Sequence, residues 1–176
     1  RGTPQSHRLL CARPSFRART SEFRQFRAYL SAPDPVVLSD DAVMTVIGTG
    51  TSLEGDRWSL VTDVADDDPV IWLEVETPSG HRSKGGYGSP PLEPGMRLGT
   101  YTGHDEVGPD QIILRVADDV SGVTVTLSDG RHERLALYSD PTHSGVALAA
   151  LVYPRNLDIH RIDLSAPSGE PLPDRL

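Results

Sequence analysis

The sequence predicts a mainly-β protein built as an antiparallel sandwich of about 8 to 10 short strands, with one short helix near the N-terminus. Turn-forming residues are abundant, with 16 glycines and 15 prolines among 176 residues. Apolar and polar residues alternate with a period of two in several runs after Val36, as in half-buried strands. Residue pairs typical of tight turns separate these runs.

The clearest hairpin spans residues 123–137. Valine and leucine alternate with threonine and serine over 123–128, and Asp129-Gly130 follows, a pair that favours a tight turn because it tolerates positive φ. Residues 71–76 alternate in the same way and end at the turn sequence 77–80. Further strands are predicted at residues 43–48, 57–63, 97–102, 111–117, 145–152 and 157–164, the last with a bulge at His160-Arg161, where the alternation breaks.

The N-terminal segment, residues 1–31, differs in charge from the rest of the chain. It contains seven arginines and one acid, a net charge of +6, so the remaining 145 residues carry −14 of the total of −8. We call residues 1–31 the basic arm and predict that residues 32–176 form the β domain. This asymmetry indicates an arm that meets an acidic surface.

The arm contains the one helix that the sequence predicts, at residues 21–30. Phe23, Phe26 and Leu30 recur at helical spacing, and the proline-containing segment 31–35 ends the helix. We expect the arm to dock on its own body, on a neighbouring subunit or on an acidic partner. Nucleic acid is an alternative partner, although the acidic body would repel phosphate. The expected contact residues are Arg17, Arg19, Phe23, Arg24, Phe26 and Arg27.

Cysteine content and hydropathy bear on location. Cys11 is the single cysteine, so no disulfide forms within the chain. No apolar run reaches the roughly 18 to 20 residues that cross a bilayer, and no secretory signal is evident at the N-terminus. These features slightly favour the cytoplasm and predict no membrane span, but the chain begins at Arg1 rather than methionine, so a targeting segment could precede it.

Several stretches resemble a module common in high-GC actinobacterial proteins. They are residues 122–131 (GVTVTLSDGR), 145–150 (GVALAA) and 159–171 (IHRIDLSAPSGEP), together with 55–60 (GDRWSL) and 71–76 (IWLEVE). The resemblance covers residues 55–171 and implies an immunoglobulin-like β-sandwich that is often exported or membrane-tethered, with no assigned chemistry. A jelly-roll-like sandwich fits the strand pattern as well. The module often carries a cysteine pair near the positions of Trp72 and Tyr87, where this chain has aromatic residues.

An acidic run is the candidate metal site. Asp63, Asp66, Asp67 and Asp68 lie between two predicted strands and precede Pro69. Ca²⁺ takes about six to eight oxygen ligands in flexible sites, so these carboxylates are candidate calcium ligands. The alternative interpretation is a solvated acidic turn, which requires no cofactor.

Aromatic residues and one lysine are the candidate ligand-binding residues. The favoured interpretation is a Trp72 that is buried in the core or covered by the helix predicted at 21–30. The alternative is an exposed Trp72 that, with Tyr87 or Tyr101, forms a stacking platform for a sugar ring or for an apolar residue of a partner. Lys84 is the only lysine and lies in the glycine-rich stretch 82–91, which is predicted to be a mobile surface loop with the potential to bind an anion.

Catalytic signatures are weak in this sequence. The nucleophile-elbow pattern Gly-x-Ser-x-Gly is absent, and the nearby triad-type residues of 140–144 are typical of a turn. The histidines at 81, 104, 132, 143 and 160 would have to meet in space to bind a metal. The sequence therefore favours a non-catalytic interaction or structural module, with a carbohydrate- or ligand-binding domain and a metal-dependent enzyme as alternatives.

Overall fold

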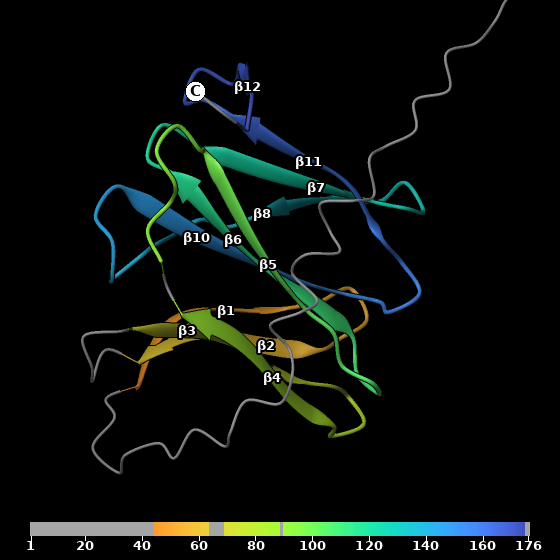
Figure 1. Ribbon diagram of the computed structural model, residues 1–176. Coiled ribbons are helices and arrows are strands. Elements are labelled where there is room, and N and C mark those ends of the chain that lie inside the picture. The colour runs from red at the N-terminus through yellow and green to blue at the C-terminus, as the bar shows by residue number, and fades with distance from the viewer. Residues whose placement is uncertain (1–43, 64–68, 89, 175–176) are drawn as a thin grey trace, which may run out of the picture. The chain divides into compact units, whose positions relative to one another are not determined.

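A computed structural model describes residues 44–63, 69–88 and 90–174, which contain twelve strands and no helix (Figure 1). The chain divides into two units, Arg1–Leu38 and Ser39–Leu176, and every described residue belongs to the second. The helix predicted at residues 21–30 lies outside the described residues. In the described part, no helix has the length and apolar character to cross a membrane.

The strands form three four-stranded antiparallel sheets. The N-terminal sheet contains, in spatial order, β1 (Met44–Thr51), β2 (Arg57–Asp63), β3 (Val70–Glu76) and β4 (Arg82–Gly88). The central sheet contains β5 (Leu98–Gly103), β6 (Asp110–Ala117), β10 (Val146–Tyr153) and β9 (Tyr138–Ser139). The C-terminal sheet contains β12 (Pro171–Leu172), β11 (Ile159–Ser165), β7 (Gly122–Leu127) and β8 (His132–Leu135).

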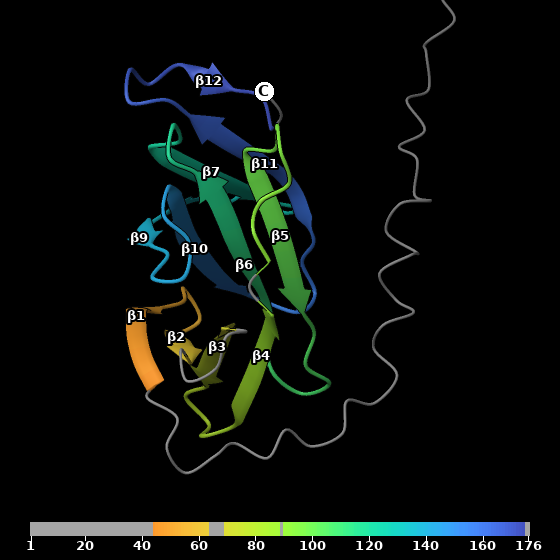
Figure 2. The ribbon, with the colours of Figure 1, turned by 60° about the vertical axis from the view of Figure 1, so that its left-hand side comes forward.

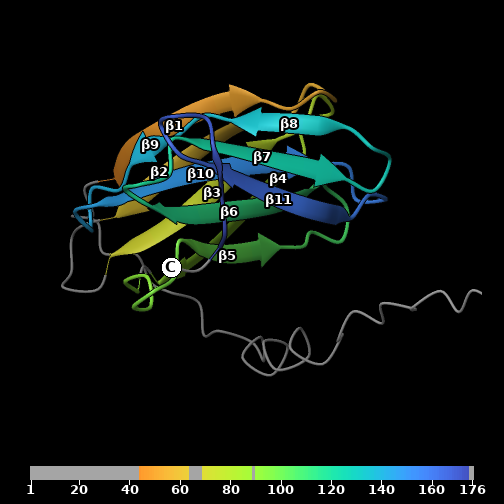
Figure 3. The same ribbon diagram turned by 90° about the horizontal axis from the view of Figure 1, so that it is seen from above.

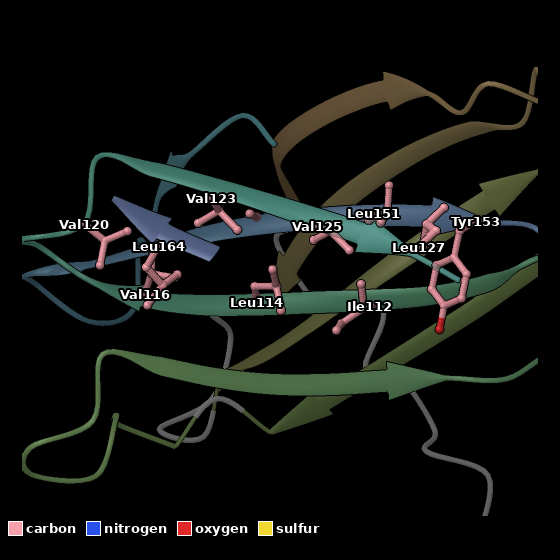
Figure 4. Packing of buried hydrophobic residues seen from close by; sticks show 11 residues of the cluster. Ile112, Leu114, Val116, Val120, Val123, Val125, Leu127, Leu151, Tyr153 and Leu164 are labelled. Atoms are coloured by element: carbon pink, nitrogen blue, oxygen red, sulfur yellow. The ribbon is translucent and has the colours of Figure 1, made fainter. Parts of the chain in front are cut away.

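Strands β6 and β10 form the centre because both of their faces are covered. Alternate side chains of β6 enter two separate apolar clusters: Leu114 packs with residues of β7 and β11, and Ile113 with residues of β2 and β3. On β10, Ala149 belongs to the first of these clusters and Leu148 to the second. Figure 4 shows the first of these clusters, between β6 and β7. A strand that is covered on both faces carries apolar side chains on both. This explains the continuous apolar run at residues 145–153.

The three sheets are stacked, with the central sheet between the other two (Figure 2). Seen from above, β1 and β8 lie along one side of this stack and β5 lies toward the opposite side (Figure 3). The short strand β9 is the edge of the central sheet on the same side as β1. This side, where three sheet edges come together, is where the candidate site lies.

Most sequence-based predictions of strands and turns are confirmed. β7 and β8 form the expected hairpin, and Gly130 between them has a φ of 87°. The register of β11 against β7 shifts between Ile159 and Arg161, as the break in alternation predicted. The described residues form twelve strands rather than 8 to 10, and two of the twelve, β9 and β12, are only two residues long.

The prediction that residues 82–91 form a loop is wrong for 82–88, which form β4. The glycines of this segment permit close packing rather than flexibility. A Cβ at Gly85 would lie 2.1 Å from the amide nitrogen of Gln111, and a Cβ at Gly86 would lie 2.4 Å from the Cβ of Trp72. Glycine is thus required at position 86, where the contacts are with the backbone and Cβ of β3, whereas at position 85 the contact is with the end of the Gln111 side chain.

Candidate functional site

A groove opens where the chain passes from one sheet to another. After β8 of the C-terminal sheet, the chain crosses through residues 136–137 and enters the central sheet as β9. β9 pairs only with Ala147 and Leu148 of β10, whereas β6 pairs with β10 from Val146 to Tyr153. Among the described residues, the rest of this edge of β10 has no strand beside it.

The uncovered edge of β10 presents backbone polar groups. The N–H of Asp140 donates to the carbonyl oxygen of Val146 at 3.0 Å, so Val146 directs its backbone groups toward the β9 side. Because successive residues of an antiparallel strand alternate between their two neighbours, Ala150 and Val152 face the same side. These residues are 5% and 3% exposed, and buried backbone groups are almost always hydrogen-bonded. The edge therefore offers hydrogen bonds to water or to an extended ligand.

A cavity of about 160 Å³ lies beside this edge, and we call it the β10 groove. Its floor is β10, one wall is the β1–β2 hairpin with Trp58, and the other wall is β8 with the crossing residues. Polar and apolar side chains share the lining. The lining residues are Thr51–Leu53, Trp58, Leu127, Arg131, Glu133–Ala136 and Ala150–Pro154.

Two glycines of β1 shape the wall formed by the N-terminal sheet. The ring of Trp58 lies 2.3 Å from the position that a Cβ at Gly50 would take. The ring of Tyr138 lies 2.5 Å from the corresponding position at Gly48. The hydroxyl of Tyr138 donates to the carbonyl oxygen of Thr49 at 3.4 Å. The absence of side chains at Gly48 and Gly50 thus lets two aromatic rings lie against β1, with Trp58 facing the groove.

The opposite wall contains an unpaired carboxylate. Glu133 of β8 pairs with Val125 of β7, and directly paired residues point to the same face of a sheet. Since Val125 is fully buried against the central sheet, Glu133 also points toward the central sheet and lines the groove. Its side chain makes no hydrogen bond or ion pair with any other residue that the structure describes.

Arg131, which also lines the groove, is already paired with acids. Arg131 Nε lies 2.6 Å from Asp129 Oδ2, and Arg131 Nη1 lies 3.8 Å from Glu54 Oε1 in the β1–β2 turn. Arg131 therefore links the two walls and is balanced by two acids. Arg134 also belongs to the lining, but it follows Glu133 along β8 and its side chain therefore points to the outer face of the C-terminal sheet. Among the described residues, Glu133 is thus the charged side chain that faces the groove without a partner.

A second polar cluster is buried inside the protein. Arg115 Nη2 lies 2.9 Å from Asp140 Oδ2, and the two side chains are 4% and 0% exposed. Asp140 Oδ1 accepts hydrogen bonds from the backbone N–H and the hydroxyl of Thr142. This ion pair fixes the segment between β9 and β10 onto β6, a structural role. The buried Nε of Arg115, Oε1 of Gln111 and Oγ of Ser83 have no hydrogen-bond partner among the described atoms.

The predicted aromatic platform is not formed, because Trp72 and Tyr87 lie on opposite faces of the N-terminal sheet and Tyr101 belongs to β5 of the central sheet. Trp72 is 2% exposed, and its ring lies 3.7 Å below the ammonium of Lys84. Tyr87 points to the other face and stacks on Tyr101 with a centroid distance of 4.9 Å and an interplanar angle of 14°. Burial raises the pKa of Tyr87 above its ordinary value, an effect that the nearby Arg115 opposes. Burial also raises the pKa of Tyr101.

The predicted calcium ligands are described only in part. Asp63 is the last residue of β2, whereas Asp66, Asp67 and Asp68 lie outside the described residues. Within the described ranges, no three His, Cys, Asp or Glu side chains are arranged to hold a metal ion.

The histidines are dispersed over separate elements. His81 Nε2 lies 3.1 Å from Asp105, and His104 Nδ1 lies 3.1 Å from Asp110. His132 contacts Thr126 on the C-terminal sheet, His143 contacts Thr142 beside the buried ion pair, and His160 lies in the β11 bulge. The backbone N–H groups of Val107 and Gly108 hold the pKa of Asp105 well below its ordinary value, and His81 adds to this effect.

The predicted arm contacts lie outside the described residues: Arg17, Arg19, Phe23, Arg24, Phe26 and Arg27. The β10 groove, in contrast, was not predicted. The alternation of Leu135 and Leu137 is typical of one continuous strand, and nothing in the local sequence marks the crossing between them. The closest signal is Gly48-Thr49-Gly50, in which two glycines occupy the same face of a strand.

No protein-family model, no curated protein and no solved structure matches this chain.

Proposed function

We propose that this protein is a non-catalytic interaction module. The observation that carries the proposal is the β10 groove, where a buried strand edge and the unpaired Glu133 face a cavity between two sheets. Such an edge serves recognition because its backbone groups accept a further strand without any chemistry. The rigid sheets on both sides hold these groups in place.

The basic arm is the second part of the proposed interaction surface. Its charge of +6 opposes the −14 of the remaining 145 residues, which supports docking on its own body, on a neighbouring subunit or on an acidic partner. Arg17, Arg19, Arg24 and Arg27 supply the charge in this proposal, and Phe23 and Phe26 supply apolar contact.

The proposal extends to the fold family. Antiparallel pairing in all three sheets and two separate apolar interfaces support a sandwich of the immunoglobulin-like or jelly-roll-like kind. The resemblance of residues 55–171 to modules of actinobacterial proteins stands beside this as a proposal that comes from the sequence.

Charge neutralisation tests the arm in the full chain. Arg24→Gln/Arg27→Gln removes two arm charges, and Arg57→Gln/Arg82→Gln removes two charges from the body as a control. Both control side chains pair with Glu76, but they are 73% and 79% exposed, and such surface pairs contribute only about 0 to 1 kcal/mol. We expect the arm variant alone to change the sedimentation mass or the thermal midpoint, with the difference shrinking at high salt. Identical mass and midpoint for wild type and arm variant would refute the arm's role.

A further inference from the structure

We propose that the β10 groove binds an extended basic peptide of a partner protein, which adds to β10 as a strand. The proposal rests on the proposed interaction function and specifies the chemistry of the partner. Three features carry it: the uncovered edge of β10, the apolar wall at Trp58 and the unpaired carboxylate of Glu133.

The backbone of β10 sets the conformation of the peptide. β9 already occupies the position that such a peptide would extend, since Tyr138 pairs with Leu148. Beyond it, Ala150 and Val152 each direct one N–H and one C=O toward the groove. The five residues Ala149–Tyr153 span about 17 Å at roughly 3.4 Å per residue, so a strand paired with them would be about five residues long. The cavity of about 160 Å³ would receive part of this strand, and the rest would lie outside it.

The two walls of the groove determine which side chains the peptide needs. Successive side chains of a strand point to opposite faces, so alternate residues of the peptide would face Trp58 on one wall and Glu133 on the other. An apolar residue fits beside the indole ring, and a lysine or arginine compensates the carboxylate. Arg131 is already balanced by Asp129 and Glu54, and Arg134 points to the outer face of its sheet. Among the described residues, an acidic peptide would therefore find no unpaired cation that faces the groove.

Glu133 also explains why the edge would select its partner. An inward-pointing charge on an edge protects a sheet against indiscriminate pairing. The same carboxylate that rejects an apolar or acidic strand is neutralised by a basic one, so one side chain supplies attraction and exclusion together. The net charge of −14 over residues 32–176 adds a general attraction for cationic segments.

Tryptophan fluorescence of the full chain tests binding. The probe is a seven-residue peptide in which lysine alternates with valine, and the control peptide replaces lysine with glutamate. We expect the lysine peptide alone to change the emission. Trp58→Phe should abolish the change and Trp72→Phe should retain it, because Trp72 faces the other side of the N-terminal sheet.

The charge of Glu133 has its own matched control. Glu133→Gln should weaken binding of the lysine peptide about fivefold, the value of a modest ion pair. Glu170→Gln removes an equal charge from an exposed turn and should leave the affinity unchanged. Equal affinities for the lysine and glutamate peptides, or equal effects of the two substitutions, would overturn the proposal.

Amide hydrogen exchange, measured residue by residue by NMR, distinguishes strand addition from other binding. The lysine peptide should slow exchange at Ala150 and Val152, whereas Ala149 and Leu151 should not change because their amides already face β6. Binding without this pattern would overturn strand addition. Slow exchange at Ala150 and Val152 in the free chain would also overturn it, by showing that the chain fills its own groove. If the arm variants alter association but no peptide binds, the interaction function stands and the peptide proposal fails.

Discussion

Gly86→Ala should destabilise the protein, although Gly86 lies in a glycine-rich segment that the sequence suggests is a loop. Gly86 of β4 pairs with Trp72 of β3. A Cβ at Gly86 would lie 2.4 Å from the Cβ and 2.9 Å from the Cα of Trp72, and 2.7 Å from the carbonyl oxygen of Ile71. These atoms belong to the backbone or are attached directly to it, so no side-chain rotation relieves the clash. β4 must move away from β3.

The expected cost follows from overpacking in a close-packed region, which is about 1 to 3 kcal/mol. Displacement of β4 also disturbs the stack of Tyr87 on Tyr101, and such aromatic pairs contribute about 0.5 to 1.5 kcal/mol. A total of about 1.5 to 4.5 kcal/mol would lower the melting temperature by roughly 3 to 18 °C for a chain of this size.

Gly88→Ala is the matched control in the same strand. A Cβ at Gly88 meets nothing within 4 Å, so this substitution should be neutral or should stabilise by up to about 1 kcal/mol by restricting the unfolded chain. Urea unfolding followed by far-UV circular dichroism compares the two variants with wild type. Equal midpoints for Gly86→Ala and Gly88→Ala would refute the close approach of β3 and β4.

Three further predictions concern charged and titrating groups. Arg115→Met strands the buried Asp140 carboxylate and should cost about 3 to 5 kcal/mol in urea unfolding, whereas the further change Asp140→Leu should recover part of that loss; an unchanged midpoint for Arg115→Met would contradict the ion pair. Hydrogen bonds from the following loop lower the pKa of Asp105 from 3.8, so its contribution to stability is present above roughly pH 4 and is lost as the pH falls; Asp105→Asn should flatten the acid side of a stability–pH profile, and a profile identical to wild type would disprove this. Burial raises the pKa of Tyr153 from 10.0 to about 12, so its contribution to stability is complete below pH 10 and is lost as the pH rises through 12. Burial also delays the titration of Tyr87 and Tyr101 by raising the pKa of each, so Tyr153→Phe should reduce the late-titrating part of the tyrosinate absorbance without abolishing it; an unchanged late titration would contradict the burial of Tyr153.

Local pattern was sufficient for much of the fold. The alternation at 123–128 with Asp129-Gly130 predicted the β7–β8 hairpin, and the interrupted alternation at His160 predicted the register shift in β11. Both features depend on neighbouring residues along the chain, where backbone sterics and the two-residue period act directly. They are accordingly visible in the sequence.

The errors occurred where packing between distant segments decides the structure. Glycines at 85 and 86 are typical of a loop, yet they pair with β3 as part of a strand. Gln111 and Trp72 occupy the space where their side chains would be, so these glycines allow close packing. Trp72 does alternate with the inward residues of β3 as predicted, but its ring lies under Lys84 instead of forming a platform with Tyr87. A sequence shows which face a side chain takes and not what covers that face.

The sequence by itself determined that this is an antiparallel β protein with a charge-divided chain, because turn chemistry, strand period and net charge are local or additive properties. Only the tertiary structure decided that β6 and β10 are covered on both faces and that the chain changes sheets at residues 136–137. That crossing leaves an edge of β10 uncovered beside Glu133 of β8 and Trp58 of β2. These three strands are separate segments of the sequence. Their meeting depends on how the sheets stack, and stacking is a property of the whole core.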